Sequence, residues 1–201
     1  THAGRGRYDL EQAEFGDTQT RRPEWPEGIG RLLMRSDVPE AVAAYVGAVR
    51  RFDRQQGNLG RSVRFYPGSP WLARGWMRSQ DRMALCELHP AEEAALRAEM
   101  ARVPCVGVYL LNGYHAIRAM LPCGEKRALV LIDPPFESVD EWKMIVGAVK
   151  DALARMPATV VAIWYPLTVR AKVDAFLDEL KTLDLPSAWV AEMAVAGPES
   201  A

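Results

Sequence analysis

Short apolar runs alternate with amphipathic segments from residue 83 to residue 195, and this alternation limits the possible folds more than any other feature. Five of the runs have the length of strands, at residues 83–88, 106–111, 128–132, 160–165 and 189–195. The segments between them have helical spacing, at residues 91–101, 114–121 and 169–180 and in the stretch that begins with a capping-box pair, Ser138 and Glu141. Such alternation predicts an α/β fold with a mostly parallel sheet.

The first 80 residues follow a different pattern. Residues 1–8 are predicted to form a Gly-containing loop. Such a loop normally follows a buried strand, so we expect that strand to be missing from this sequence. Residues 22–58 have helical spacing and end in a turn at 55–58. Ser69, which precedes a proline, is predicted to be the N-cap of a helix that continues to about residue 78.

Length and cysteine content exclude several protein classes. A chain of 201 residues suits one domain or one domain with an insert. No stretch approaches the roughly 20 apolar residues of a membrane helix, and the polar start is unlike a signal peptide, so we expect a cytoplasmic protein with no membrane partner. The three cysteines, Cys86, Cys105 and Cys123, are far apart, which argues against disulfides or a zinc site. We expect Cys86 and Cys105 to be buried, because both lie in apolar runs.

The net charge of −1 hides an uneven distribution. Residues 1–78 hold 13 Arg, no Lys and 9 Asp or Glu residues. Residues 79–201 hold 7 Arg, 5 Lys and 17 Asp or Glu residues. Because guanidinium groups match the geometry of phosphate oxygens, the Arg-rich part is a candidate surface for nucleic acid. Solvated helix faces explain the same bias equally well on charge alone.

The strongest chemical signal is Asp-Pro-Pro-Phe at residues 133–136, directly after an apolar run. The two prolines fix the backbone and remove two N–H donors, which leaves the Asp133 carboxylate and the Pro134 carbonyl as acceptors. Two acceptors can hold an amino group, localise its lone pair and take up its proton, and Phe136 offers a face on which a flipped base can stack. The motif therefore indicates chemistry on the amine of a base, without choosing adenine over cytosine or RNA over DNA. The alternative is a rigid turn with no chemistry.

Other polar residues follow the neighbouring runs. Ligands of a parallel sheet bind beyond the carboxyl ends of its strands. Glu87 lies at such an end, where its carboxylate can accept hydrogen bonds from ribose hydroxyls, and Asn112 and Gly113 follow the next run. Trp164 either lines a base pocket or packs in the core. The three histidines lack the spacing of metal ligands, so no metal site is predicted.

Four motifs together identify a family. They are Thr-His-Ala-Gly-x-Gly-Arg-Tyr at residues 1–8, Phe-Tyr-Pro-Gly-Ser-Pro at 65–70, Glu-Leu-His-Pro at 87–90 and Leu-Ile-Asp-Pro-Pro-Phe-Glu at 131–137. In this order they resemble the J-type adenine-N6 methyltransferases of 23S ribosomal RNA, the RlmJ-like proteins, some of which carry an older label of involvement in the catabolism of external DNA. The resemblance covers nearly the whole chain.

The resemblance implies a class I methyltransferase fold, S-adenosylmethionine as cofactor and 23S ribosomal RNA as partner, and we expect a monomer. Residues 1–9 and 65–201 would be the core, and residues 10–64 a helical insert that contacts RNA. A first central strand and further sheet after residue 195 would lie outside this sequence. The implied catalytic residues are Asp133, Pro134 and Phe136. The implied cofactor-binding residues are His2, Gly4, Ser69, Glu87, Asn112, Gly113 and Asp133, with Asn112 standing where the family usually has an acidic residue.

Two other functions stay open at this point. A nicotinamide-dependent oxidoreductase would have Gly-x-Gly-x-x-Gly after its first strand, whereas Gly4 and Gly6 are followed by Arg7, Tyr8 and Asp9. A non-catalytic nucleic-acid-binding protein linked to DNA utilisation would bind nucleic acid without transferring a methyl group.

Overall fold

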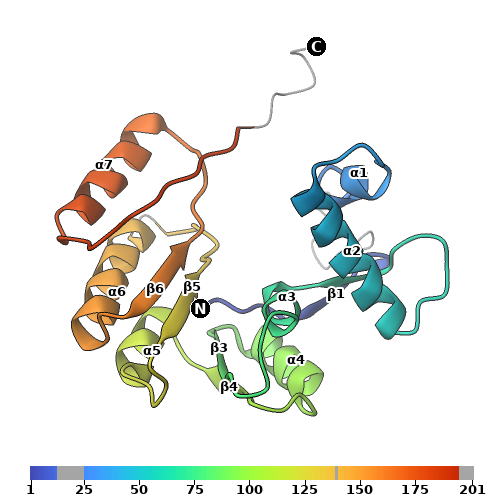
Figure 1. Ribbon diagram of the computed structural model, residues 1–201, viewed down its shortest axis with the longest axis horizontal. Helices are drawn as coiled ribbons and strands as arrows, with labels where there is room; N and C mark the ends of the chain where they lie inside the picture. Colours follow the sequence, from blue (N-terminus) through green and yellow to red (C-terminus); the bar gives the residue numbers. More distant parts are fainter. Residues whose placement is uncertain (13–24, 139, 195–201) are drawn as a thin grey trace. The chain divides into compact units, whose positions relative to one another are not determined.

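The computed structural model describes residues 1–12, 25–138 and 140–194, which form two compact units (Figure 1). We call Ala3–Leu110 the N-terminal unit, and Leu111–Ala201 with Thr1–His2 the C-terminal unit. The N-terminal unit contains β1 (Arg7–Asp9), α1 (Ile29–Leu33), α2 (Glu40–Gln55), β2 (Phe65–Pro67), α3 (Ser69–Arg74), β3 (Met83–Glu87), α4 (Pro90–Met100) and β4 (Val106–Leu110). The C-terminal unit contains α5 (Gly113–Met120), β5 (Ala128–Ile132), α6 (Glu141–Arg155), β6 (Thr159–Ile163) and α7 (Arg170–Lys181).

The core of the C-terminal unit lies against one face of a parallel strand pair. β5 pairs with β6 in a register that runs from Ala128 opposite Thr159 to Ile132 opposite Ile163. Side chains of alternate strand residues join the apolar faces of α5, α6 and α7, and Ile132 and Ile145 in this core are fully buried. This packing fixes the end of β5, and therefore the position of the residues that follow it.

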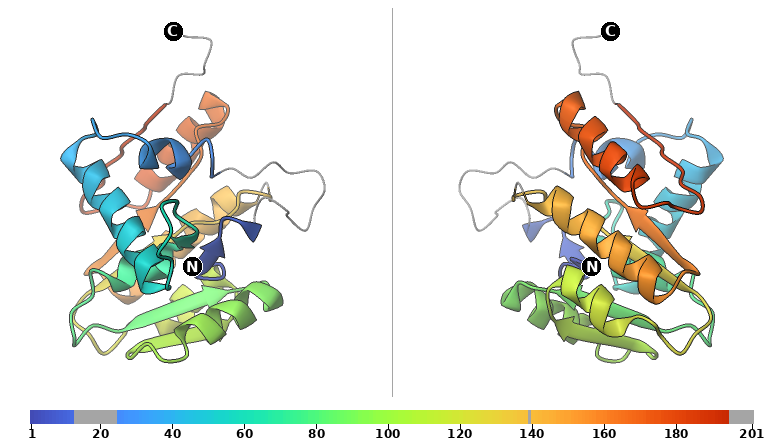
Figure 2. Two further views of the ribbon diagram at one scale, coloured as in Figure 1. Left: turned by 90° about the vertical axis from the view of Figure 1, so that its right-hand side faces the viewer. Right: turned by 90° about the vertical axis from the view of Figure 1, so that its left-hand side faces the viewer.

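The N-terminal unit contains two smaller sheets. β3 and β4 form a parallel pair covered by α4 (Figure 2). Leu96 of α4 is fully buried. β1 and β2 form an antiparallel pair, with Tyr8 opposite Tyr66, and α2 packs on β2. The α/β class predicted from the alternation of runs is confirmed.

Most predicted elements are confirmed to within one or two residues, and the exceptions have local causes. Ser69 is not the N-cap of α3, because the helix begins one residue earlier than expected, with Gly68 as its N-cap. The Gly68 carbonyl accepts the first helical N–H groups, and a Cβ at Gly68 would lie 2.9 Å from the carbonyl oxygen of Gly6. The helix ends at Arg74 instead of residue 78, with Gly75 as its C-cap.

Three further expectations need correction. The helical segment at 22–58 is two helices, α1 and α2, and residues 22–24 lie outside the described part. The capping box at Ser138 is wrong, because α6 starts at Glu141 and the Ser138 hydroxyl accepts from the Asp140 N–H, at 3.2 Å. Residues 189–194 form no strand, since Trp189 is 88% exposed and the segment has no partner strand among the described residues; residue 195 lies outside them.

The buried carboxyl of Glu141 makes a testable prediction about stability. Glu141 is 6% exposed, its Oε2 has no hydrogen-bond partner in the described part of the chain, and burial raises the pKa of its carboxyl. Such a group stabilises the fold below its unfolded pKa, and this stabilisation is lost as the pH rises through the folded pKa. We expect Glu141→Gln to raise the free energy of unfolding by about 1–2 kcal/mol at pH 8 and by less at pH 5. Urea unfolding of both proteins at the two pH values measures this, and a difference that does not depend on pH would contradict it.

Candidate active site

Asp133 follows β5 directly; the charged amino group of Thr1 lies near its carboxyl, but the two residues that follow Asp133 in the turn bring no N–H donor. Its side chain is half-buried, and burial raises the pKa of its carboxyl. No N–H or O–H group of the described residues donates to that carboxyl. The next residue, Pro134, is buried, and neither it nor Pro135 has an N–H. The turn therefore presents acceptors without donors, which is the complement of an amino group.

Aromatic rings lie beside this turn. The ring of Phe136 lies 4.8 Å from that of Trp142 and 6.0 Å from that of Trp164, in tilted arrangements. Phe136 has a φ of +54°, a left-handed conformation that costs a non-glycine residue about 1–2 kcal/mol. Trp164 is 55% exposed and so is not the core residue that one reading of the sequence allowed. Trp142 could not be selected from the sequence, because its helical spacing is that of an ordinary packing residue.

The first two residues of the chain lie against the same strand end. The amino group of Thr1 donates to the Leu131 carbonyl at 2.7 Å. His2 has a φ of +54°, and its ring meets the edge of the Tyr114 ring at 4.9 Å. A Cβ at Gly113 would lie 2.4 Å from the Cβ of Thr1, so only glycine permits this approach at the start of α5.

Asn112 is the N-cap of α5. Its Oδ1 accepts the N–H of Tyr114 at 2.9 Å and that of His115 at 3.3 Å. The amide oxygen of this implied cofactor-binding residue therefore holds the first turn of the helix, while the amide Nδ2 has no partner among the described residues. An Asn at this position serves both as a cap and as a polar group beyond the end of β4.

Glu87 organises the corresponding region of the N-terminal unit. It is 9% exposed, and its carboxylate accepts three backbone N–H groups. Oε2 accepts from Gly4 at 2.8 Å, and Oε1 accepts from Leu88 at 2.8 Å and from His89 at 2.9 Å. Glu87 thereby ties the first loop to the end of β3, and Oε2, which accepts one N–H group, keeps unused acceptor capacity.

The turn before α3 lies against the same loop. The Gly68 N–H donates to the Gly6 carbonyl at 2.7 Å, which places Ser69 beside the loop that contains Gly4. Gly4 and Gly6 have φ values of +62° and +81°, which side chains would strain. The structure thus brings together Gly4, Ser69 and Glu87 in one unit, and His2, Asn112, Gly113, Asp133 and Phe136 in the other.

A cavity of about 270 Å³ lies beside Trp164 in the C-terminal unit. Glu192 forms part of its wall, accepting a hydrogen bond from the Tyr165 hydroxyl at 2.9 Å and pairing with Arg170 at 2.8 Å. An aromatic lining with a few fixed polar groups is typical of ligand-binding pockets. This cavity is therefore a second feature of the C-terminal unit that suits a planar, polar ligand.

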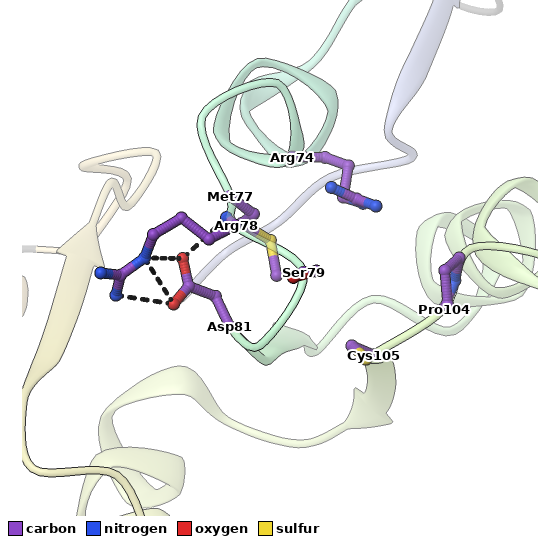
Figure 3. A pocket seen from close by; sticks show the side chains of 7 residues that line it. All are labelled: Arg74, Met77, Arg78, Ser79, Asp81, Pro104 and Cys105. Atoms are coloured by element: carbon purple, nitrogen blue, oxygen red, sulfur yellow. Dashed lines mark hydrogen bonds and ion pairs between the residues drawn. The ribbon is translucent and has the colours of Figure 1, made fainter.

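A cavity of about 160 Å³ in the N-terminal unit has a different character (Figure 3). Arg78 there is neutralised by Asp81, with Nη2 and Oδ1 2.8 Å apart. Cys105, which was expected to be buried, is exposed at this cavity because it lies in the turn that leads into β4, where its carbonyl accepts the Met83 N–H. Among the described residues no group of acidic, His or Cys side chains could hold a metal ion. In that part of the chain, no helix is long and apolar enough to cross a membrane.

Comparison with known proteins supplies the context for these residues. The family model described as "Ribosomal RNA large subunit methyltransferase D, RlmJ" matches residues 1–201. Two proteins are named "Ribosomal RNA large subunit methyltransferase J", one from Haemophilus influenzae and one from Escherichia coli. Their sequences are 37% and 35% identical to this chain, respectively, in alignments that cover 97% of it. The crystal structure of a Legionella pneumophila protein superposes with a TM-score of 0.74 at 34% identity, covering 91% of this chain and 64% of that one. The chain spans 66% of the length of the two named relatives.

Proposed function

The chain belongs to the ribosomal RNA large subunit methyltransferase D, RlmJ, family, and from that premise we propose that it takes part in transfer of a methyl group from S-adenosylmethionine to the N6 amine of an adenine in 23S ribosomal RNA. The α/β methyltransferase fold expected from the four motifs is confirmed by the family match and the structural neighbour. The observation that carries the proposed reaction is the donor-free acceptor turn at Asp133, with Phe136 beside it.

The residues around the first loop fit a nucleoside cofactor. Glu87 can accept a hydrogen bond from a ribose hydroxyl with the lone pair of Oε2 that its three N–H partners leave unused. The glycines of the loop and Ser69 allow close approach of a ligand to the backbone. In the C-terminal unit, we propose His2, Asn112, Gly113 and Asp133 as further cofactor contacts, with the amide Nδ2 of Asn112 as a hydrogen-bond donor.

When bound, S-adenosylmethionine would supply the methyl group. Asp133 and the Pro134 carbonyl would each accept a hydrogen bond from the adenine amine, so that its lone pair is localised on nitrogen. The amine forms one bond to carbon as the sulfur–carbon bond breaks, and it loses one proton, which the Asp133 carboxylate can receive. Phe136 would stack on the base after it is flipped out of the RNA, and exposed Trp164 offers a second aromatic face.

The raised pKa of Asp133 predicts the pH dependence of the reaction. Only the ionised carboxylate can receive the proton, so kcat/KM should fall as the pH drops through a pKa that lies above the ordinary value of about 3.9 for an aspartate. We therefore expect the acidic limb of the pH–rate profile to lie at a higher pH than for an ordinary aspartate. The limb should be measured in single-turnover assays, and an acidic limb at or below pH 3.9 would contradict the role of burial.

The experiment that tests the function is methyl transfer with isotopically labelled S-adenosylmethionine. The substrate is 23S ribosomal RNA from cells that lack the gene, and the product is digested and analysed by mass spectrometry for N6-methyladenosine. RNA binding with no methyl transfer by the gene's full-length product would favour the non-catalytic alternative. If the protein binds a nicotinamide cofactor and does not bind S-adenosylhomocysteine, an oxidoreductase is favoured. Gly4 and Gly6 argue against this function, because they lead into the strand β1 and not into the helix that such cofactors require.

The partners of the protein follow from the proposed reaction. A ribosomal RNA substrate places the protein in the cytoplasm, where ribosomes are assembled. Neither a metal ion nor a membrane takes part in the proposed chemistry, and we propose that the protein works as a monomer. Residues 10–64 are proposed as the insert that contacts RNA, and residues 1–9 and 65–201 as the core.

A further inference from the structure

A loop after α2 is held in place by a buried carboxylate. Asp53 is 5% exposed, and its Oδ1 accepts the N–H groups of Arg64 at 3.1 Å and Phe65 at 2.8 Å. Both of its oxygens also accept from Asn58 Nδ2, at 3.0 Å and 2.8 Å. The same Asn58 side chain donates to the Ser62 carbonyl and accepts from the Gly60 N–H. We call residues 57–62 the Asp53 loop, and its conformation is fixed by hydrogen bonds and not by an apolar core.

The Asp53 loop exposes side chains that have no role in folding. Leu59 is 93% exposed, one of the most exposed large apolar residues in the described part of the chain. Arg61 on the loop, and Arg51 and Arg54 on the adjoining last turns of α2, are exposed and form no ion pair with any described residue. The loop is tied to that helix end, since the Gly57 N–H donates to the Arg54 carbonyl at 3.0 Å.

Helix stability explains only part of this arrangement. A cation near a helix C-terminus interacts favourably with the helix dipole, which is sufficient reason for Arg54. It is no reason for Arg61, which lies outside the helix. It is also no reason for an exposed leucine on a loop whose Asn58 side chain is hydrogen-bonded to Asp53, Gly60 and Ser62. A fixed apolar side chain among unpaired guanidinium groups matches a surface that binds phosphates and contacts a base or ribose at once.

We propose that the Asp53 loop, together with Arg51 and Arg54, is a preformed RNA-binding surface of this protein. The three arginines bind phosphates of the RNA backbone, Leu59 packs against an unpaired nucleotide, and Asp53 is a positioning residue that holds the loop. This inference rests on the proposed function, because it takes RNA as the substrate, but it assigns residues that the methyl-transfer chemistry does not use. An RNA with unpaired, splayed nucleotides suits a loop of this size better than a regular duplex.

The test measures RNA affinity of the full-length protein without cofactor, by fluorescence anisotropy with a labelled fragment of 23S ribosomal RNA over a range of salt concentrations. We expect Arg54→Ala/Arg61→Ala to weaken binding about tenfold or more near physiological salt and to reduce the slope of log affinity against log salt by about 1–2, because two phosphate contacts are lost. Leu59→Ser should weaken binding several-fold without changing the slope. Asp53→Asn should act like the double arginine variant if it folds, since it frees the loop.

Arg102→Ala is the matched control, because Arg102 is exposed, lies in the same unit and has no ion-pair partner among the described residues. It should bind RNA as the unaltered protein does. The proposal would be overturned if Arg54→Ala/Arg61→Ala bound RNA with the affinity and salt slope of the unaltered protein. It would also be overturned if this variant lost more affinity for anionic lipid vesicles than for RNA. The surface variants leave Asp133 intact, and their RNA affinity tests the proposed RNA-binding surface. Methyl transfer by the unaltered protein tests the proposed function, so the two proposals can fail separately.

Discussion

Asp133→Asn is expected to lower kcat/KM for methyl transfer by about 10³-fold or more, with little change in the free energy of unfolding. An amide oxygen can still accept a hydrogen bond from the base, but it cannot receive the proton that the amine must lose, and proton transfer of this kind contributes about 10²–10⁴-fold. The fold should tolerate the change, because the carboxyl has no hydrogen-bond donor among the described residues and its burial disfavours the charged form. Asp133→Ala should lose activity further, since the acceptor itself is gone.

The control for this substitution makes the same chemical change on the same segment. Asp140 is exposed and is the N-cap of α6 without a side-chain capping hydrogen bond, so Asp140→Asn removes one charge and no hydrogen bond. It should transfer methyl groups as the unaltered protein does. Methyl transfer by Asp133→Asn within tenfold of the control, with S-adenosylhomocysteine binding retained in both, would remove Asp133 from the reaction.

The position of Asp133 was predictable because the strand before it is defined by composition. A run of five apolar residues at 128–132 predicts a strand that lies parallel to another such run, and it forms β5 over those residues, with Ile132 fully buried although Leu129 on the other face is 70% exposed. Because β5 ends at Ile132, Asp133 must lie at the carboxyl end of this strand. The same argument places Glu87 at the end of β3 and Asn112 two residues after β4.

Features that depend on contacts between distant segments could not be predicted in this way. β1 and β2 are three residues each and pair across more than 50 residues, so neither has a periodic pattern of its own. Asp53 looks like a surface residue of an amphipathic helix, and only the return of the chain at Arg64 shows that it is buried. Phe136 and Trp164 are likewise brought together by the pairing of β5 with β6.

Glu87→Ala is expected to lower the free energy of unfolding by about 2–4 kcal/mol and to weaken S-adenosylhomocysteine binding about tenfold or more. The stability loss follows from three backbone N–H groups that lose a charged acceptor, because hydrogen bonds to charged groups contribute about 1.5–3 kcal/mol each. All three hydrogen bonds are partly buried, but Leu88 and His89 are exposed residues, so their N–H groups can regain part of the loss from water. Without the carboxylate the Gly4 N–H no longer ties the first loop to the end of β3, and the loop should lose its fixed conformation. The cofactor would then lose both the carboxylate and the shape of the loop.

Two further variants separate these two contributions. Glu87→Gln keeps one acceptor oxygen for Leu88 and His89 but turns an amide N–H₂ toward the Gly4 N–H, so its stability should lie between those of the alanine variant and the unaltered protein. Glu92→Ala removes a carboxylate five residues away that pairs with Arg5 at the surface, and such pairs contribute about 0–1 kcal/mol. Urea unfolding and calorimetric titration with S-adenosylhomocysteine measure both quantities. If Glu87→Ala unfolds at the same urea concentration as Glu92→Ala and binds the ligand equally well, Glu87 neither orders the loop nor contacts the cofactor.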